Sequence, residues 1–368
     1  MYLVITQCFA SRVGGIENLL TNLALNLALT NEVRVFADSH SRINDEIFDS
    51  NDGNILKIFR YGGIKFLRRR KKSRDIKLFI QDRKIDGIIA DTWKSLELCI
   101  DEINLLNIPT ICLAHGNELL FNEEKRKNRI TRILKKTKKI VTNSSYTFQL
   151  VKNLGISESN ITIVNPGTED LRLIETRNKY NISGNPVLIT LARLEKRKGH
   201  SKVLEAIKQL KPDFPEIKYI IAGEGPEKKT LLNLTKKLNI EDAVIFINNV
   251  DNKGKKEIFE KSNLMVMPTS NESFNRSIEG FGIVFIEAAL FGITSIATNV
   301  GGTSDAIIDE KTGLLLKNED SLYLEIKKLL QNKEKLEQLG RNAKKRVLEN
   351  FLWNNVIKKY LEFLKANS

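Results

Sequence analysis

Short apolar runs alternate with longer amphipathic runs along the first half of the chain. The short runs are continuous and rich in β-branched residues, which is typical of strands buried on both faces. They are YLVITQ, EVRVFAD, GIIADT, PTICLAH, KIVTNS and ITIVNP. Between several of them lie segments such as IENLLTNLALNLALT (16–30) and SLELCIDEINLLN (95–107), whose apolar residues recur every three or four positions and predict helices. A parallel sheet wrapped by helices is therefore expected.

A polar segment near the middle of the chain interrupts this alternation. EDLRLIETRNKYNISGNP, residues 169–186, ends in Gly and Pro and predicts a linker. A second series of buried-strand patterns follows, PVLITLARL, KYIIAGEG, AVIFINNV, LMVMPT and ITSIATNV, and the chain from SLYLEIKKLL onward has the pattern of helices.

The length of 368 residues exceeds the usual size of one core. We therefore expect an α/β protein of two Rossmann-like domains, each with a doubly wound parallel sheet. The first is expected over 1–170, a linker over 171–186, and the second over 187–350. A last helix within 351–368 is expected to pack back on the first domain.

Basic residues outnumber acidic ones by 59 to 45, which leaves a formal net charge of +14. Residues 60–74 contain eight basic and no acidic residues, and residues 122–139 contain nine basic and two acidic ones. Three interpretations stay open: a solvated helix face, an anionic membrane surface, or nucleic acid. The runs lack the interleaved aromatics that stack on bases, and apolar side chains lie among the cations, namely Phe66, Leu67, Ile130, Ile133 and Leu134. A membrane is therefore favoured over nucleic acid.

Three features bear on location. No run of 18 or more apolar residues occurs, so no membrane span is predicted. The opening MYLVITQCFA suits a buried strand better than a signal peptide. Cys8, Cys99 and Cys112 lie in apolar stretches without CxxC spacing, which favours reduced, buried thiols. We expect a cytoplasmic protein.

Glycines and cations follow several of the predicted strands. Ligands of doubly wound sheets bind beyond the carboxyl ends of the strands, so these positions are informative. Arg193 and Lys198 follow the first strand of the second domain and suit a diphosphate, although surface cations are the ordinary alternative. Gly223 and Gly225 follow another strand, in a turn that could face a nucleotide.

Gly14 and Gly15 precede the first predicted helix. A backbone without side chains lets an anion approach a helix N-terminus, although a plain tight turn explains the pair equally well. No G-x-G-x-x-G dinucleotide fingerprint is present here.

The stretch IEGFGIVFIEAA, residues 278–289, places two acids around a helix start predicted between Gly282 and Val284. The first amides of a helix have no intrahelical partners and, with the macrodipole, favour a phosphate. Glu287 lies roughly 6 to 8 Å further along the axis, where a carboxylate suits a ribose diol. Glu279 precedes the helix and would face the group beyond the phosphates. The pattern predicts a site for nucleotide, diphosphate and sugar.

The same residues match a known family. The pattern E-G-F-G-x-x-x-x-E from Glu279 to Glu287, followed by GITSIATNVGGTSDAIIDEKTGLLL, resembles the retaining nucleotide-sugar glycosyltransferases of the GT4 family (glycosyltransferase group 1). The resemblance covers nearly the whole chain and is stronger after residue 185. It implies the GT-B fold, in which two Rossmann-like domains face a central cleft, the first binding the acceptor and the second the donor.

The resemblance also implies a role for each matching residue. Glu287 is expected to bind the ribose, Glu279 to lie near the donor sugar, and Arg193 and Lys198 to hold the diphosphate. The expected donor-binding residues are Gly14, Gly15, Arg193, Lys198, Gly223, Gly225, Gly282, Ile283, Val284 and Glu287. The expected catalytic residues are His115, Arg193, Lys198 and Glu279. Judged without the family, His115 is more simply a hydrogen-bonded histidine at a strand end.

The implied activity is transfer of a hexose-type sugar from a nucleoside-diphosphate sugar to a glycan or lipid-linked acceptor, with retention of anomeric configuration. Neither a protein nucleophile nor a cofactor is expected. No D-x-D motif occurs and the three histidines are not clustered in sequence, so no metal is expected. The implied setting is synthesis of a cell-surface polysaccharide, such as capsule or lipopolysaccharide, at the inner face of the plasma membrane. A sugar-nucleotide epimerase of similar architecture and a nucleic-acid-binding protein are the alternatives.

Overall fold

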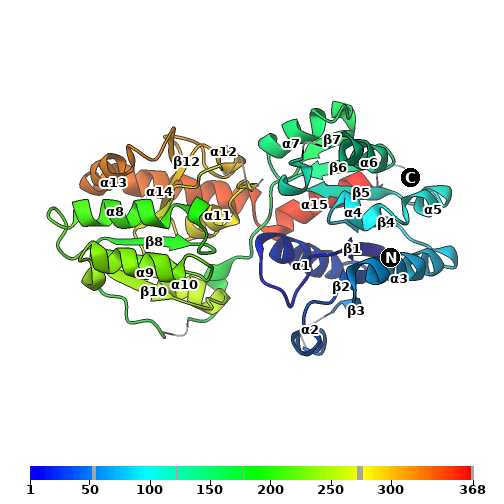
Figure 1. Ribbon diagram of the computed structural model, residues 1–368, viewed down its shortest axis with the longest axis horizontal. Helices are drawn as coiled ribbons and strands as arrows, with labels where there is room; N and C mark the ends of the chain where they lie inside the picture. The colour runs from blue at the N-terminus through cyan, green and yellow to red at the C-terminus, as the bar shows by residue number, and fades with distance from the viewer. Residues whose placement is uncertain (52–54, 122, 177, 272–276, 366–368) are drawn as a thin grey trace. The chain divides into compact units, whose positions relative to one another are not determined.

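The chain forms two compact units in the computed structural model, which describes residues 1–51, 55–121, 123–176, 178–271 and 277–365 (Figure 1). Unit 1 comprises Met1–Gly167 and Trp353–Ser368, and unit 2 comprises Thr168–Leu352. Residue 122 of the second basic run, residue 177 of the expected linker and residues 366–368 of the expected last helix lie outside the described residues.

Unit 1 is built on a sheet of seven strands in the order β3-β2-β1-β4-β5-β6-β7. Every neighbouring pair is parallel, and Val4 lies opposite both Val35 and Ile89 in the register. The strands are β1 (Tyr2–Thr6), β2 (Val33–Asp38), β3 (Lys57–Tyr61), β4 (Gly87–Ala90), β5 (Thr110–Ala114), β6 (Lys139–Thr142) and β7 (Ile161–Ile163).

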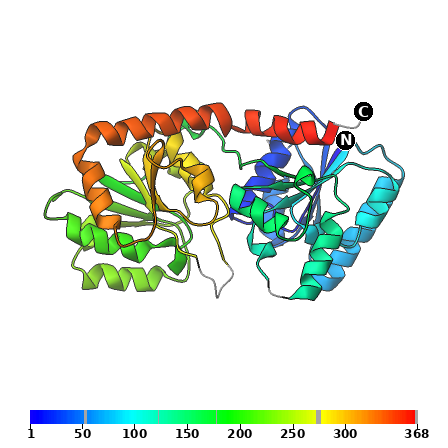
Figure 2. The same ribbon diagram turned by 90° about the horizontal axis from the view of Figure 1, so that it is seen from above.

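Helices cover both faces of this sheet. They are α1 (Gly15–Ala28), α2 (Arg42–Asp49), α3 (Lys65–Gln81), α4 (Trp93–Leu96), α5 (Ile100–Leu105), α6 (Glu124–Leu134), α7 (Ser145–Lys152) and α15 (Trp353–Lys365). Leu3 and Ile5 of β1 belong to the core beneath α3 to α7, whereas Tyr2 and Val4 belong to the core beneath α1 and α15. Because a strand has a period of two, successive side chains enter opposite cores, and both must be apolar. Figure 2 shows α15 beside α1, which it contacts.

Unit 2 repeats this plan with six parallel strands in the order β10-β9-β8-β11-β12-β13. Its strands are β8 (Val187–Leu191), β9 (Lys218–Ala222), β10 (Val244–Ile247), β11 (Leu264–Met267), β12 (Thr294–Thr298) and β13 (Gly313–Leu316). Its helices are α8 (His200–Leu210), α9 (Lys228–Lys237), α10 (Asn252–Glu260), α11 (Ile283–Leu290), α12 (Thr303–Ala306), α13 (Leu322–Gln331) and α14 (Lys333–Asn350). Ile189 joins the core beneath α10, α11 and α14, and Leu188 joins the core beneath α8, α9 and α13.

The strand order reverses direction once in each sheet. In unit 1 the reversal lies between β1 and β4, and in unit 2 it lies between β8 and β11. The connections that leave two adjacent strands there run to opposite sides, which opens a crevice outside their carboxyl ends where doubly wound proteins bind ligands. Each unit therefore has one predicted ligand position.

Three elements differ from the pattern in the sequence. The structure contains two strands, β3 and β13, that the apolar runs of the sequence did not predict. β3 is an edge strand whose sequence KIFRY mixes cations with apolar residues, and an edge strand needs no continuous apolar run. The helix expected over 95–107 is divided into α4 and α5, because the amide of Cys99 bonds to the carbonyl of Leu96 at 3.0 Å and closes a turn.

The segment expected to be a linker, residues 171–186, lies within unit 2. The amides of Lys179 and Tyr180 donate to the buried carboxylate of Glu257 at 2.8 and 2.6 Å. The amine of Lys256 donates to the carbonyl of Ile174 at 2.7 Å. These bonds tie the polar segment to α10, so its polarity reflects hydrogen bonding to unit 2 and not a free connection.

The two basic runs become α3 and α6, and their apolar residues differ in exposure. Ile130, Ile133 and Leu134 of the second run are at most 2% exposed and belong to the core. The expectation that these three residues contact a membrane is therefore wrong. Phe66 and Leu67 of the first run are 58% and 59% exposed. Only the first run retains apolar side chains that reach solvent.

Candidate functional site

The loop that follows β8 carries Arg193 and Lys198 and is held in place by the turn after β9. The amide of Leu194 donates to the carbonyl of Glu224 at 2.9 Å. A Cβ at Gly223 would collide with the carbonyl oxygen of Ala192, and Gly223 has a φ of +142°. The glycines of the GEGP turn are thus explained by close backbone packing against the Arg193 loop, which positions that loop at the carboxyl edge of the sheet.

Lys198 and Glu279 form the centre of the site. Their amine and carboxylate form an ion pair, and both side chains are nearly buried, at 11% and 12% exposed. The guanidinium of Arg197 also reaches Glu279, at 3.4 Å. Glu195 accepts a hydrogen bond from Arg197 at 3.2 Å and forms an ion pair with Arg193 at 3.0 Å. Ion pairs of alternating charge therefore run from Arg193, whose side chain is exposed, to the nearly buried Glu279.

Opposing effects set the ionisation of Glu279. Burial raises the pKa of its carboxyl, but the charges of Lys198 and Arg197 and their hydrogen bonds lower it further, and the net pKa lies below the ordinary value. Glu279 is consequently an anion at neutral pH. A carboxylate held between two cations can stabilise positive charge on a nearby sugar without acting as a proton donor.

Two close backbone contacts fix Glu279 and Lys198. The amide of Gly302 donates to the carbonyl of Glu279 at 2.8 Å, and a Cβ at Gly301, which has a φ of +57°, would collide with the same carbonyl. A Cβ at Gly199 would collide with the carbonyl of Pro268 at the end of β11. The loops that follow β8, β11 and β12 therefore pack closely against one another where the strand order of unit 2 reverses.

The helix α11 begins where the sequence predicted. Gly282 is its N-cap with a φ of +94°, and Ile283 is its first helical residue. Glycine supplies no side-chain cap, so the first amides of α11, at Ile283 and Val284, have no capping side chain as partner. A helix N-terminus of this kind attracts a phosphate through its amides and its dipole.

Glu287 is the fifth residue of α11 and is ion-paired with Lys255 of α10. The amine of Lys255 lies 2.6 Å from Oε1 of Glu287, and the Glu287 side chain is 7% exposed. Within the described residues no protein donor is assigned to Oε2 of Glu287. One oxygen is fixed by a cation and the other can accept a hydrogen bond from a ligand hydroxyl.

The remaining predicted residues belong to unit 1. His115 follows β5, is 6% exposed, and its Nε2 lies 2.9 Å from the carbonyl oxygen of Asp91. Because a carbonyl oxygen only accepts, Nε2 is the donor in this hydrogen bond. Gly14 is the N-cap of α1 and Gly15 is its first residue. The carboxylate of Glu17 lies against Gly14 and pairs with Arg12 at 3.1 Å. An acid of the chain itself thus occupies the first turn of α1.

The structure separates the predicted residues into two groups. Arg193, Lys198, Glu279, Gly282, Ile283, Val284, Glu287, Gly223 and Gly225 lie in unit 2, and His115, Gly14 and Gly15 lie in unit 1. Sequence reasoning missed Arg197 and Lys255, which pair with the two acids of the motif. The basic loop EKRKG contained Arg197 but gave no reason to choose it, and Lys255 has no sequence signal.

The described part of the chain contains no group of three or more His, Cys, Asp or Glu side chains placed to hold a metal ion. Cys8, Cys99 and Cys112 are free thiols, and Cys99 and Cys112 are buried.

Models of two known families match the chain. The model of the family described as "Glycosyl transferases group 1" matches residues 174–346, and that of "Glycosyltransferase Family 4" matches residues 13–170. The two matches together extend over most of both units. The chain belongs to the group 1, family 4 glycosyltransferases, as the pattern from Glu279 to Glu287 indicated.

Curated relatives match the chain over part of its length. The GDP-mannose-dependent alpha-(1-6)-phosphatidylinositol monomannoside mannosyltransferase of Mycolicibacterium smegmatis is 26% identical over 179 residues, 48% of this chain and 47% of the relative. The N-acetyl-alpha-D-glucosaminyl L-malate synthase of Bacillus anthracis is 30% identical over 191 residues, 51% of this chain and 48% of the relative. The matched part of the chain thus spans about half the length of these relatives.

Solved structures match over the whole chain. HepE from Anabaena in complex with UDP has a TM-score of 0.81 at 17% identity, with 99% of both chains covered. Sucrose-phosphate synthase from Thermosynechococcus elongatus has a TM-score of 0.79 at 20% identity, covering 99% of this chain and 98% of that one. The lipopolysaccharide outer core galactosyltransferase WaaB has a TM-score of 0.73 at 14% identity, with both chains fully covered. These matches confirm the GT-B fold expected from the sequence.

Proposed function

We propose that this chain transfers a hexose-type sugar from a nucleoside-diphosphate sugar to a glycan or lipid-linked acceptor, with retention of anomeric configuration. The observation that carries the proposal is the convergence of Lys198, Glu279 and the N-terminus of α11 at the switch point of unit 2. Structures of HepE with UDP and with UDP-glucose support a nucleoside-diphosphate sugar as the donor. WaaB, of the same fold, supports a role in cell-surface polysaccharide synthesis.

The proposed mechanism assigns each group of this site to a charge that changes during the reaction. Negative charge grows on the departing diphosphate, and Lys198, Arg193 and the first amides of α11 supply the opposing charge. Oε2 of Glu287 accepts a hydrogen bond from the ribose. Glu279 stabilises the positive charge that develops on the sugar. His115, in unit 1, is the residue that family resemblance assigns to the donor sugar.

Neither a protein nucleophile nor a metal ion has a role in this proposal. Cations and amide dipoles of the chain take the part that a divalent ion plays in other transferases. We expect full activity in EDTA. Complete loss of activity in EDTA, restored by a divalent ion, would contradict metal independence.

Thermal unfolding with a panel of nucleoside diphosphates and their sugars tests the donor. A ligand at a hundred times its Kd adds about 2.7 kcal/mol to the free energy of unfolding, which is readily measured. We expect one nucleoside diphosphate and its sugar to raise the melting temperature, and Glu287→Ala to reduce that shift. No shift with any member of the panel would refute the donor assignment. Conversion of the sugar donor without any acceptor would indicate an epimerase instead.

We further propose that unit 1 binds an anionic membrane surface through the start of α3. Ile64, Phe66 and Leu67 are 74%, 58% and 59% exposed there. The guanidinium of Arg70 lies 4.1 Å from the centre of the Phe66 ring. Exposed apolar side chains beside cations are typical of surfaces that lie on anionic lipid. Within the described residues no helix is both long and apolar enough to cross a membrane.

Other cations of this run are committed to the fold and do not contribute to that surface. Lys72 and Arg68 pair with the buried Asp38 at 2.6 and 3.0 Å. Arg60 pairs with Asp49 at 2.7 Å. The residues available to lipid are therefore those at the first turns of α3.

Vesicle sedimentation tests this surface. We expect binding to vesicles that contain an anionic lipid, weakened by salt because a Debye length is about 8 Å at physiological ionic strength. The double substitution Phe66→Ser, Leu67→Ser should reduce binding. Leu105→Ser is the matched control, because it also removes an exposed leucine. Leu105 is 80% exposed but belongs to the end of α5, just before β5, and not to the start of α3. Equal binding to neutral and anionic vesicles would refute the proposal.

A further inference from the structure

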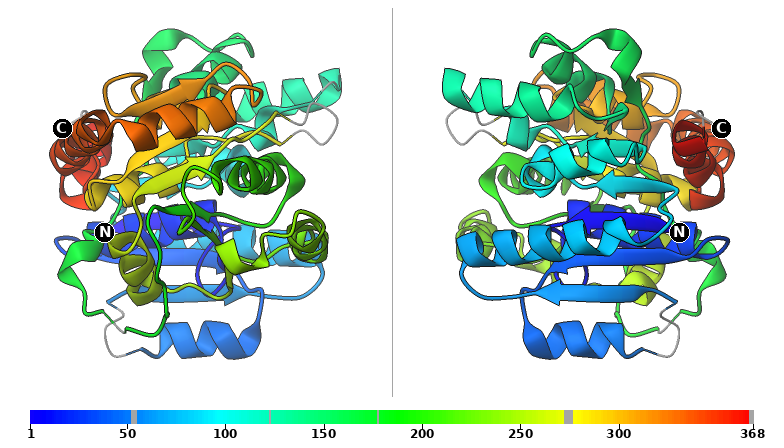
Figure 3. Two further views of the ribbon diagram at one scale, coloured as in Figure 1. Left: turned by 90° about the vertical axis from the view of Figure 1, so that its left-hand side faces the viewer. Right: turned by 90° about the vertical axis from the view of Figure 1, so that its right-hand side faces the viewer.

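Two helices of unit 2 lie side by side at the proposed ribose position. Lys255 of α10 pairs with Glu287 of α11 at 2.6 Å, and four residues further along each segment the rings of Phe259 and Phe291 lie 5.5 Å apart. Residues four apart share one face of a helix, so α10 and α11 run in the same direction here. Both cover the same core of the unit 2 sheet, and the left-hand view of Figure 3 shows helices on both faces of that sheet. The amine of Lys255 thus reaches Glu287 from a neighbouring helix of the same unit.

This ion pair divides the carboxylate of Glu287 into a used and an unused oxygen. The amine of Lys255 contacts Oε1, and within the described residues Oε2 has no assigned donor. The side chain of Lys255 is 18% exposed, so its amine is nearly buried beside the acid. A carboxylate oxygen only accepts hydrogen bonds, whereas an ammonium only donates them. The pair therefore offers a ligand one acceptor and one donor next to each other.

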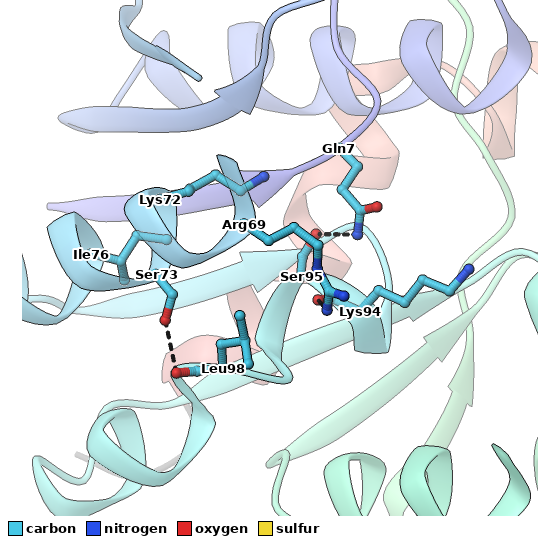
Figure 4. A pocket seen from close by; sticks show the side chains of 8 residues that line it. All are labelled: Gln7, Arg69, Lys72, Ser73, Ile76, Lys94, Ser95 and Leu98. Carbon is cyan, nitrogen blue, oxygen red and sulfur yellow. Dashed lines mark hydrogen bonds between the residues drawn. The ribbon is translucent and has the colours of Figure 1, made fainter. Parts of the chain in front are cut away.

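The amine of Lys255 has donors to spare. An ammonium carries three N–H groups, and in the described part of the chain only Glu287 is assigned to them. Lys72, which lines a small hollow of unit 1 (Figure 4), shows the contrasting case. Its amine donates both to the carbonyl of Thr6 at 2.7 Å and to Asp38 at 2.6 Å. The fold thus uses Lys72 more fully than Lys255, which can still donate to a ligand.

A second acid lies within electrostatic reach of Lys255. Asn252, the first residue of α10, donates to the carboxylate of Glu169 at 2.9 Å. Burial raises the pKa of the Glu169 carboxyl, the charge of Lys255 lowers it, and the charge of Glu287 raises it. Lys255 is therefore a cation shared by two acids, which favours its charged form and a fixed position for its amine.

We propose that Lys255 forms the second half of the ribose site. Oε2 of Glu287 accepts a hydrogen bond from one of the two ribose hydroxyls, and the amine of Lys255 donates one to the oxygen of the other. A hydroxyl can both donate and accept, so a neighbouring acceptor and donor match a diol. The inference rests on the proposed nucleotide donor and assigns a specificity-determining residue for it. It requires that both hydroxyls contribute to binding.

Calorimetric titration of the full chain tests this requirement. UDP and GDP are each titrated beside their 2′-deoxy and 3′-deoxy analogues. For the diphosphate that binds, we expect each analogue to have a Kd roughly tenfold higher or more, because each lacks one hydrogen bond to a charged group. This series uses the wild-type chain alone, so it does not depend on the folding of a variant. Equal affinity for the parent and one analogue would overturn the proposal.

Substitution of Lys255 then identifies the hydroxyl that it binds. Lys255→Met should bind the parent and one of the two deoxy analogues equally within about twofold, since that hydroxyl no longer has a charged partner. Lys255→Arg should restore the discrimination, because arginine keeps the charge and the donors. Lys253→Met is the matched control on the same helix, since Lys253 is exposed and pairs with Glu175 at 3.2 Å. It should keep the wild-type discrimination. Discrimination against both analogues in Lys255→Met would contradict the proposal.

Steady-state kinetics separates a ribose contact from general damage to the fold. Lys255→Met should raise the donor KM roughly tenfold or more and leave kcat within about twofold, because the ribose is bound equally before and during the reaction. A lowered kcat at unchanged KM would exclude the ribose role. If wild type binds neither diphosphate, the donor assignment fails together with the role of Lys255. If it binds one and Lys255→Met discriminates as wild type does, only the role of Lys255 fails.

Discussion

Lys198 is the side chain on which the proposed leaving-group chemistry most depends. It is nearly buried, ion-paired with Glu279, and is the last residue of a 3₁₀ turn over Lys196–Lys198. Lys196, two residues earlier in the same turn, is exposed. The loop thus offers two lysines of identical chemistry, only one of which reaches the site.

We expect Lys198→Ala to lower kcat by roughly 100- to 1000-fold, because one electrostatic contact to the transition state is lost. The donor KM should change less, since the partner charge grows only during the reaction. Steady-state kinetics with a saturating acceptor measures both. Lys196→Ala is the matched control and should retain wild-type kcat. Normal turnover by Lys198→Ala would exclude the leaving-group role.

His200 is a buried base that the proposed chemistry leaves unused. It is the first residue of α8 and 2% exposed, and within the described residues neither ring nitrogen has a hydrogen-bond partner. Burial, with a smaller contribution from the charge of Lys198, lowers the pKa of the imidazole to about 4. The ring is therefore neutral in the folded protein at physiological pH.

This pKa predicts how stability depends on pH. An unfolded histidine has a pKa of about 6.5. Between that value and about 4, the unfolded chain binds more protons than the folded chain, so the free energy of unfolding falls as pH falls. The full effect of the shift is on the order of 3 kcal/mol. Urea unfolding at pH 7 and pH 4.5 should show this loss in wild type and a smaller loss in His200→Leu. His40→Leu, at an exposed histidine, should keep the wild-type dependence. An unchanged dependence in His200→Leu would contradict the assignment.

At the residue scale, the sequence predicted the acids of the site better than their partners. Glu279 and Glu287 were identified from their spacing around a helix start. Arg197 and Lys255 were missed because an ion pair across 82 or 32 positions leaves no local pattern. The sequence also could not show why Gly223 and Gly301 are glycines. At each position a Cβ would collide with a backbone carbonyl of another loop.

At the element scale, the packing of α14 on α11 depends on one glycine. A Cβ at Gly340, inside α14, would collide with the carbonyl oxygen of Gly292, just after α11. Alanine is the better helix former by about 1 kcal/mol, so propensity and packing act in opposite directions here. The collision is with backbone, which cannot rotate away.

We expect packing to dominate, so that Gly340→Ala destabilises unit 2 by about 1 to 3 kcal/mol. Gly15→Ala is the contrasting variant, because Gly15 begins α1 and a Cβ there has nothing within 4 Å. It should be neutral or stabilising. Urea unfolding of both variants measures the difference, and a stabilised Gly340→Ala would show that the two helices separate readily.

Most elements were predictable from periodicity, and the exceptions have physical causes. Strands buried on both faces are continuous apolar runs, so β1, β2 and β8 were evident. The edge strand β3 was not, since its register is set by β2 and not by its own apolarity. The break between α4 and α5 was hidden because both halves share one apolar periodicity.

At the scale of the whole molecule, α15 belongs to unit 1 although it follows unit 2 in sequence. Its buried residues, Trp353, Val356, Tyr360 and Leu364, complete the core beneath α1. Tyr360 is 1% exposed and is among the largest fully buried side chains.

We expect Tyr360→Ala to destabilise unit 1 by about 3 to 5 kcal/mol, as for other large aromatic core residues. The nucleotide-induced stabilisation of unit 2 should persist, since α15 is not part of that unit. Lys359→Ala, at the exposed neighbouring position, should change stability by less than about 0.5 kcal/mol. Thermal unfolding with and without nucleotide reports on both units. Equal destabilisation of both transitions by Tyr360→Ala would contradict the assignment of α15 to unit 1 alone.

The position of α15 has a consequence for biosynthesis. Unit 2 comprises residues 168 to 352, or 185 residues, all translated after the strands of unit 1 and before α15. At roughly 5 to 20 residues per second, the ribosome needs about 10 to 40 s to make them. During that interval one face of the emerging seven-stranded sheet lacks its last helix, and a nascent-chain chaperone would find its apolar surface there.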